Sequence, residues 1–213
     1  MSILSKLLAI IVAVSLVQCN FNWDGEKVSG EGPVVTKNLE IDDFTAIEVS
    51  NGWKVELIPD QSKLIDILKV ESSNGKLSIS AEDNIGKADS KLIKVFFDKK
   101  LKSIEANSAS DISAKKQLIF ETTTIDASSA ADIKLNIKAE DLVVESSSSA
   151  DIELIASSQK IRIDASSSAD INIEGEFKDL KAKASSASEI YISGISKKVG
   201  LEATSSADID AKD

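Results

Sequence analysis

The stretch "ASSSADINI" at residues 165–173 recurs along the second half of the chain and decides the fold. It returns as "ASSAADIKL" (127–135), "SSSSADIEL" (146–154), "ASSASEIYI" (184–192) and "ATSSADIDA" (203–211). One acid marks each phrase, and the successive differences in sequence number along this series are 21, 19, 19, 19 and 19. Counted from residue 111, the acids are Asp111, Asp132, Asp151, Asp170, Glu189 and Asp208. A fixed period near 20 is typical of a solenoid in which each repeat forms one coil.

The residues around each serine run alternate with a period of two. In residues 161–173, one face of the expected strand would carry Ile161, Ile163, Ala165, Ser167, Ala169, Ile171 and Ile173. This alternation predicts a strand that continues through the serine run. The inward central position is serine in all six phrases: Ser108, Ser129, Ser148, Ser167, Ser186 and Ser205. We interpret these serines as a structural ladder at a narrow corner, with hydroxyls bonded up and down the column. A ligand site is the alternative.

The segments between the phrases contain Gly175, Gly194 and many charged residues, and we expect them to be turns. One coil would then be a bent strand of about 13 residues and a short return, stacked in parallel at about 4.8 Å. The predicted fold class is all-β, a parallel β-solenoid with coils of about 19 residues.

The first half of the chain follows the same scheme less regularly. Residues 47–57, "IEVSNGWKVEL", align without gaps on residues 104–114, with Trp53 in place of a small inward residue. Residues 68–80 contain an Asn-Gly turn between alternating segments, which predicts a hairpin, and residues 91–97 predict a further strand. No helix is expected beyond the N-terminal segment.

The N-terminal segment predicts a secretion signal. Lys6 precedes 11 mostly apolar residues from Leu7 to Val17, a stretch too short to span a bilayer. "LVQC" resembles a bacterial lipobox, although Gln18 stands where a small residue is usual. We therefore expect residues 1–18 to be a lipoprotein signal peptide and Cys19 to be lipidated, for example with palmitate. An ordinary secretory signal cleaved elsewhere, or an uncleaved anchor, remains the alternative.

The domain organisation follows from these patterns. Residues 19–33 are polar and predict a lipid anchor and flexible tether. Residues 34–213 would form the solenoid, with residues 34–100 its less regular part and residues 101–213 its regular repeats.

Composition excludes several classes of function. A net charge of −10 argues against nucleic-acid binding, which needs clustered Lys and Arg. The absence of histidine excludes His-based catalytic triads and His-containing zinc sites, and a single cysteine excludes disulfides within the chain. Aromatic residues make up only 4% of the chain, which favours a thin, repetitive β-structure.

The recurring acids are the best candidate site. Asp132, Asp151 and Asp170 face outward in the expected strands and could hold divalent cations through oxygen ligands. The alternative is that each acid bonds to nearby backbone or serine at a bend. The glycine-rich nonapeptide of calcium-binding β-rolls is missing, so we predict no metal site and keep these three residues as weak candidates.

Several segments together resemble one known family. "GEGPVVTKNLEIDDFTAIEVSNGWKVELIPDQ" (30–61), "VESSNGKLSIS" (70–80) and "LIKVFFDKKLKSIEANSASDI" (92–112) are similar to the autotransporter-adhesin head GIN domain, a domain of unknown function. Trp53 and Lys54 stand where this family often has an aromatic residue and an acid. The resemblance implies an all-β, solenoid-like domain of the bacterial cell envelope, often on a lipoprotein, and it supplies no catalytic residues.

Together these observations predict a lipoprotein of the cell envelope that acts as a non-catalytic structural or adhesive module, with no cofactor. We expect it to be anchored to the outer membrane of a Gram-negative-type bacterium and to bind a glycan or a protein. The alternatives are a β-solenoid that acts on polysaccharides, one that binds divalent cations, or a flat array of the ice-binding kind.

Overall fold

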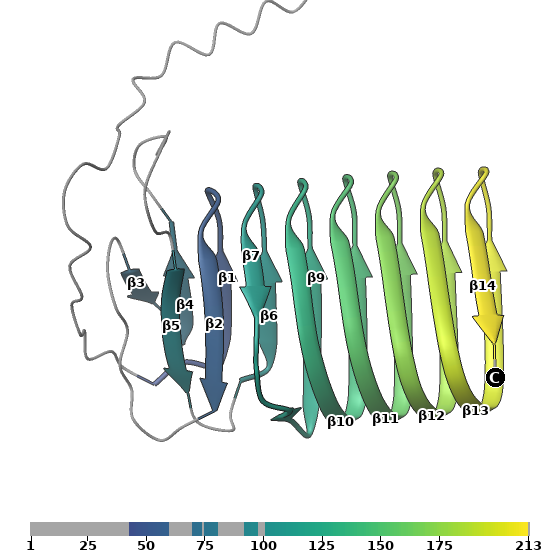
Figure 1. The fold of residues 1–213 in the computed structure, drawn as a ribbon, viewed down its shortest axis with the longest axis horizontal. Helices are drawn as coiled ribbons and strands as arrows, with labels where there is room; N and C mark the ends of the chain where they lie inside the picture. Colours follow the sequence, from purple (N-terminus) through teal and green to yellow (C-terminus); the bar gives the residue numbers. More distant parts are fainter. Residues whose placement is uncertain (1–42, 60–69, 74, 81–91, 98–100, 213) are drawn as a thin grey trace, which may run out of the picture.

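A computed structural model describes residues 43–59, 70–73, 75–80, 92–97 and 101–212, and every regular element in these ranges is a β-strand. The strands form one sheet of 14 members that closes into a solenoid (Figure 1). Asp132 pairs with Asp151, and Asp151 pairs with Asp170, so that equivalent positions of successive repeats lie side by side in parallel strands. The predicted all-β parallel solenoid, with coils of about 19 residues, is therefore confirmed.

The strands fall into a short, irregular set and a long, regular set. The short ones are β1 (Ala46–Val49), β2 (Lys54–Pro59), β3 (Val70–Ser73), β4 (Lys76–Ile79), β5 (Leu92–Phe97), β6 (Ser103–Ala106), β7 (Asp111–Ser113), β8 (Leu118–Ile119) and β9 (Thr122–Ala127). The long ones are β10 (Asp132–Ser146), β11 (Asp151–Ala165), β12 (Asp170–Ala184) and β13 (Glu189–Ala203), and the short β14 (Asp208–Lys212) follows them.

Each long strand contributes to both faces of a flattened coil (Figure 1). Its first half descends on the front face, the strand bends at the lower edge, and its second half rises on the back face to a tight turn at the upper edge. We call these two edges the bend edge and the turn edge. On the front face β5, β2 and β7 precede the long strands, and on the back face β3, β4, β1, β6 and β9 do so.

The core lies between the two faces and is filled by alternate residues of each strand. In β11, Ile152 and Leu154 are buried whereas Glu153 between them is exposed. Burying each such aliphatic side chain contributes roughly 1.5–3 kcal/mol. Buried aromatic rings are concentrated toward the N-terminal coils. Trp53 is buried there, and the rings of Phe97 and Phe120 stack with their centroids 6.3 Å apart. The long regular coils therefore depend mainly on stacked aliphatic columns.

The serine run is a turn, and the prediction that a strand continues through it is wrong. Ser167 and Ser168 have φ angles of 55° and 60°, and Ala169 N donates to Ser166 O at 3.2 Å. Two consecutive residues with positive φ inside this hydrogen bond define a type I′ turn. The central serines consequently point outward: Ser108, Ser129, Ser148, Ser167, Ser186 and Ser205 are all exposed. The inward hydroxyl ladder predicted for these side chains does not form.

The segments between the phrases also differ from the prediction. Instead of turns, they are continuous strand that bends, because β10 to β13 each run unbroken from one turn to the next. Within these segments Gly175 and Gly194 stack on Ala156, and a Cβ atom at Gly194 would overlap the carbonyl oxygen of Gly175.

The expectations for the first half of the chain are confirmed in the described residues. Ala46 pairs with Ser103 and Lys54 with Asp111, which is the predicted alignment of the two segments. Strands β3 and β4 form the expected antiparallel hairpin, and β5 occupies the expected strand at residues 91–97. The predicted signal peptide (1–18), Cys19 and the tether (19–33) lie outside the described residues.

Within the described ranges, no helix has the length and apolar character that a membrane-spanning helix requires.

Candidate binding surface along the turn edge

The turns stack into a continuous ridge held by backbone hydrogen bonds. The amide of the second central residue in each turn donates to the carbonyl of the first central residue in the next coil, as from Ser149 N to Ser167 O at 3.1 Å. The acceptors along the ridge are Ser108, Ser129, Ser148, Ser167, Ser186 and Ser205. These six residues therefore line up as a ladder through their backbone, while their hydroxyls face solvent.

A small, buried residue closes each turn from Ser110 to Ser188. Ala150 and Ala169 are fully buried, and Ser188 occupies the same position in a later coil. The Ser188 hydroxyl donates to Ala165 O of the preceding coil at 3.0 Å, so this buried polar group is satisfied. The serines that face inward are thus two residues away from those that the sequence predicted.

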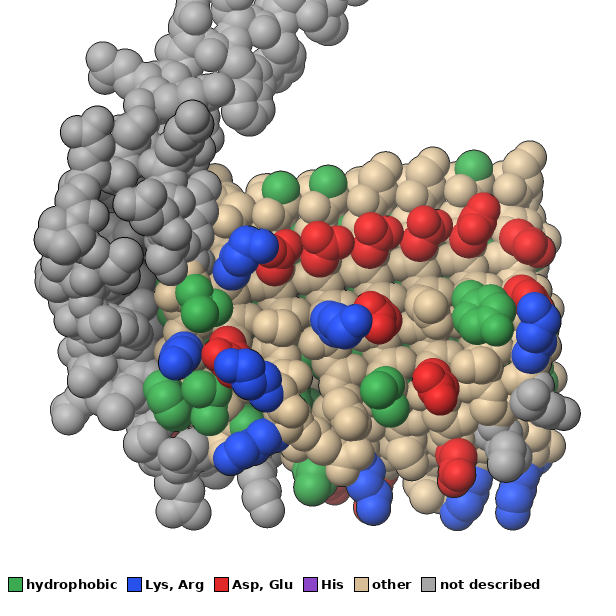
Figure 2. All heavy atoms as spheres, viewed as in Figure 1, with side chains coloured by type: hydrophobic (Ala, Val, Ile, Leu, Met, Phe, Trp, Pro, Cys, Tyr) green, Lys and Arg blue, Asp and Glu red, His purple; other side chains and the backbone are tan. Residues whose placement is uncertain are grey.

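A row of six acids runs beside the ridge on the front face (Figure 2). Each acid is the first residue of a front-face strand, and the parallel register places them side by side. We call this the front row, and it comprises Asp111, Asp132, Asp151, Asp170, Glu189 and Asp208. Lys54 closes its N-terminal end, with Nζ 2.5 Å from Asp111 Oδ2. The three weak metal candidates Asp132, Asp151 and Asp170 are therefore neighbours in one row.

Burial and like charges in the front row shift the protonation equilibrium of Asp132. Burial, followed by the charges of Asp111 and Asp151, raises the pKa of Asp132 above its ordinary value, and Lys54 opposes this. At the C-terminal end, Asp208 Oδ1 instead accepts a hydrogen bond from Ile209 N at 2.9 Å. Within the described ranges, the row is thus a line of like charges whose one ion pair is with Lys54.

A second acidic row lies on the back face, just before each turn. Its members pair in register and are Glu48, Glu105, Asp126, Glu145 and Asp164, continued by Lys183 and Glu202. Lys76 neutralises the start of this back row, with Nζ 2.9 Å from Glu48 and 2.8 Å from Glu105. Sequence reasoning missed this row, although its members from Asp126 onward follow the same repeat period as the acids of the front row.

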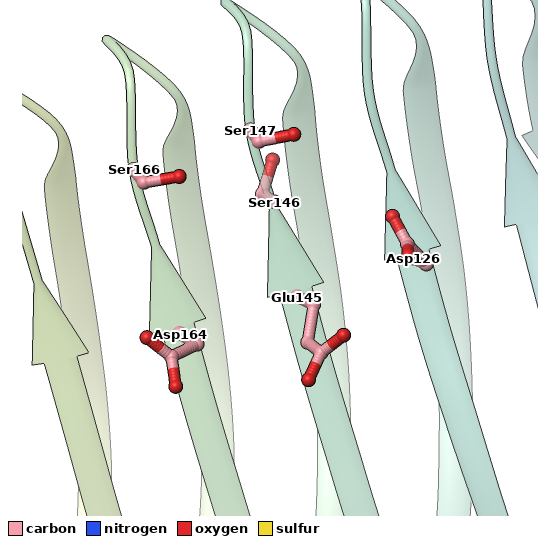
Figure 3. Close-up of a pocket in the computed structure, with 6 residues that line it drawn as sticks. All are labelled: Asp126, Glu145, Ser146, Ser147, Asp164 and Ser166. Carbon is pink, nitrogen blue, oxygen red and sulfur yellow. The ribbon is translucent and has the colours of Figure 1, made fainter.

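The middle of the back row borders a hollow of about 270 Å³. It is lined by Asp126, Glu145, Ser146, Ser147, Asp164 and Ser166, which come from three successive coils (Figure 3). Asp126 is half-buried, and burial, together with the charges of Glu145 and Glu105, raises its pKa. The hollow is therefore strongly acidic and open to solvent.

The chemistry that these residues offer is cation attraction over an extended surface. In the described part of the chain, no cluster of three or more His, Cys, Asp or Glu side chains has the geometry to hold a metal ion. Two acidic rows flank a ridge of hydroxyl-bearing and alanine turns, and each row repeats at about the spacing of neighbouring strands, 4.8 Å. Such a surface suits an extended ligand more than a compact one.

Comparison with known proteins places this architecture in a family. The profile of the family described as "Putative auto-transporter adhesin, head GIN domain" matches residues 43–158 and 155–213. The chain belongs to this family. The resemblance expected from the sequence is therefore confirmed, and it covers both the irregular and the regular coils. A search of curated proteins finds no match.

Solved structures share the fold of this head GIN domain at low sequence identity. A "putative adhesin" from Bacteroides fragilis is 12% identical with a TM-score of 0.69, covering 86% of this chain and 99% of that one. A "putative adhesin" from Parabacteroides distasonis is 15% identical with a TM-score of 0.67, covering 88% and 99%. A "putative lipid binding protein" from the same species is 17% identical with a TM-score of 0.60, covering 87% and 99%. None of these three is named as an enzyme.

Proposed function

We propose that this head GIN domain is a non-catalytic adhesive module of the bacterial cell envelope. The observation that carries the proposal is the front row, a straight line of outward-facing carboxylates fixed by a parallel sheet. A rigid, repeating surface engages an extended partner at many points without an entropy cost for ordering itself. The adhesin names of the family and of two similar structures support this role. The partner is a glycan or a protein that presents cations, directly or through bound calcium.

The anchor is the second part of the proposal. The short apolar segment that ends at Cys19 supports lipidation of that cysteine and attachment to the outer membrane. The polar residues 19–33 would then separate the solenoid from the lipid surface. Acylation of Cys19 with palmitate is tested by metabolic labelling of cells that express the full chain. The Cys19→Ala variant should carry no label and should no longer partition into the detergent phase. A variant that is still labelled and still partitions into detergent would contradict the anchor.

Binding is tested with the full chain in detergent on arrays of glycans and extracellular proteins, with and without calcium. The triple variant Asp132→Asn, Asp151→Asn, Asp170→Asn should lose the signal. The matched back-face variant Asp126→Asn, Glu145→Gln, Asp164→Asn removes three charges as well and should retain it. An equal loss of binding signal in both variants would show that binding depends on net charge and not on the front row. A wild-type chain that binds nothing on either array would refute the adhesive role.

The acidic hollow allows a test against catalysis, because a carboxyl group with a raised pKa beside another carboxylate is also a feature of glycosidases. The full chain should release no product from a panel of polysaccharides. Turnover that Asp126→Asn abolishes would place the protein among enzymes.

A further inference from the structure

The C-terminal end of the solenoid has an open edge. Within the described residues, β14 pairs only with β13, and the second half of β13 pairs only with β12. The amides and carbonyls on the outer side of these two segments have no strand partner. Such an edge is a template for another strand.

Apolar side chains are exposed at this end although they occupy core positions. Val199 and Leu201 are 55% and 45% exposed, whereas Leu180 and Ala182, their partners one coil earlier, are 1% and 2% exposed. Ile209 and Ala211 continue the core columns of Ile190 and Ile192 on the front face. A further layer of β-structure would bury this surface as every inner coil buries its neighbour.

The charge order of β14 favours one occupant. Its sequence, Asp-Ile-Asp-Ala-Lys, begins with an acid and ends with a base, and its register with β13 places Ile209 and Ala211 on the core side. If β14 pairs antiparallel with β14 of a second copy about Asp210, Asp208 of each chain faces Lys212 of the other, and the two Asp210 side chains face each other at the centre. Lys212 Nζ already lies 2.5 Å from Asp210 Oδ2 of its own chain, so one ammonium would compensate two carboxylates. The inward residues Ile209 and Ala211 face each other in the same register.

From this edge, the exposed core residues and the charge order, we propose that two copies of this chain associate through their C-terminal ends. The interface is isologous, since the same strand serves both sides. It extends the sheet across the dimer and turns the two front faces into one longer structure. It does not depend on the adhesive function.

The association is tested by sedimentation velocity of the full chain in detergent, over a series of concentrations. The wild-type chain should sediment as a dimer at tens of micromolar. Leu201→Lys should raise the dissociation constant about tenfold or more, which corresponds to about 1.4 kcal/mol. Ile155→Lys is the matched control, because Ile155 is 56% exposed on the front face of β11, away from the edge, and it should leave the constant unchanged.

A charge exchange tests the antiparallel register without altering the core. Lys212→Asp and Asp208→Lys should each weaken the dimer severalfold, and the double variant should restore it. A wild-type chain that remains monomeric at about 100 µM, corresponding to less than about 5.5 kcal/mol of association, overturns the proposal. A double variant no better than the single variants overturns it as well.

Discussion

Both edges of the solenoid connect its front face to its back face, but they do so with different residues. At the turn edge, the coils reverse direction through turns with two consecutive positive-φ residues, and from residue 108 onward the turn residues are almost all Ser or Ala. At the bend edge, the position that ends at Gly194 changes from coil to coil, in the order Leu118, Ile137, Ala156, Gly175 and Gly194. The chain thus repeats its sequence faithfully at one edge and varies it at the other.

The difference shows what repetition in a solenoid reports. Both central residues of each turn adopt left-handed φ angles, and the turns bond to one another through their backbone, so a bulky side chain there gains no packing. At the bend edge, side chains fill the interior and can compensate one another between coils. Fidelity of the repeat therefore marks a backbone constraint, and variation marks a packing constraint.

The strongest way to break the bend edge is Gly194→Ala. Gly194 has a φ of 125°, and an added Cβ would overlap the carbonyl oxygen of Gly175, so the backbone of two coils must move. We expect a loss of about 3 kcal/mol in the free energy of unfolding, measured by urea denaturation. Gly200→Ala is the control, because its nearest new neighbour is Lys181 Cγ at 3.9 Å. An equally large loss of unfolding free energy in Gly200→Ala would show that the Cβ overlap at Gly194 is not what makes that position sensitive.

At the turn edge, the largest effect is expected beside the turn and not at its tip. Ala169 is fully buried, so Ala169→Leu should overpack the core and cost about 2 kcal/mol in urea melts. Ser166→Leu, on the other side of the turn and half-buried, should cost about 0.5 kcal/mol or less. Similar midpoints for the two variants would contradict the assignment of Ala169 to the core.

The tip of the turn should respond to backbone conformation. Ser167→Gly removes the steric cost of a left-handed residue and is expected to stabilise the chain by about 0.5–1 kcal/mol. Ser166→Gly, at a position with no positive φ, should instead destabilise it by about 0.5 kcal/mol. Thermal melts that shift in the same direction for both variants would argue against a type I′ turn.

The smallest effect is expected in the front row and depends on pH. Because the folded state raises the pKa of Asp132, its ionised form opposes folding above that pKa, and this penalty disappears below the unfolded value of about 3.9. Asp132→Asn should therefore raise stability at pH 7 by less than about 0.5 kcal/mol, since the side chain is exposed. The gain should vanish near pH 3 and shrink in about 1 M salt. A gain in the free energy of unfolding that stays constant between pH 3 and 7 would exclude the ionised Asp132 carboxylate as its cause.

The sequence could predict the period, the parallel register and the row of acids, because all three follow from identical spacing. It could not place the turn. Ala165 and Ala169 are four residues apart and both buried, so the buried positions of the two strands keep the same parity across the turn although Ser167 between them is exposed. Asn-Gly is a common sequence at the two central positions of a type I′ turn, and it occurs here at Asn51 and Gly52. The pair Ser167 and Ser168 is not such a sequence.

The back row and the open edge were missed for different reasons. Glu145 and Asp164 precede the serine run and repeat with the same period as the acids that follow it, so the period alone does not single out either row. Val199 and Leu201 are exposed because, within the described residues, no later strand pairs with the second half of β13, whereas their partners Leu180 and Ala182 are buried one coil earlier.

The ladder of turns has a mechanical consequence. The coils stack along the axis of the solenoid (Figure 1), and hydrogen bonds between strands and between turns join each coil to the next. A pull between the two ends would therefore load these bonds a few at a time and peel the last coil away before the next one yields. Each coil that detaches would release roughly 65 Å of extended chain. Under tension the domain should lengthen in equal steps and dissipate mechanical energy as each coil detaches.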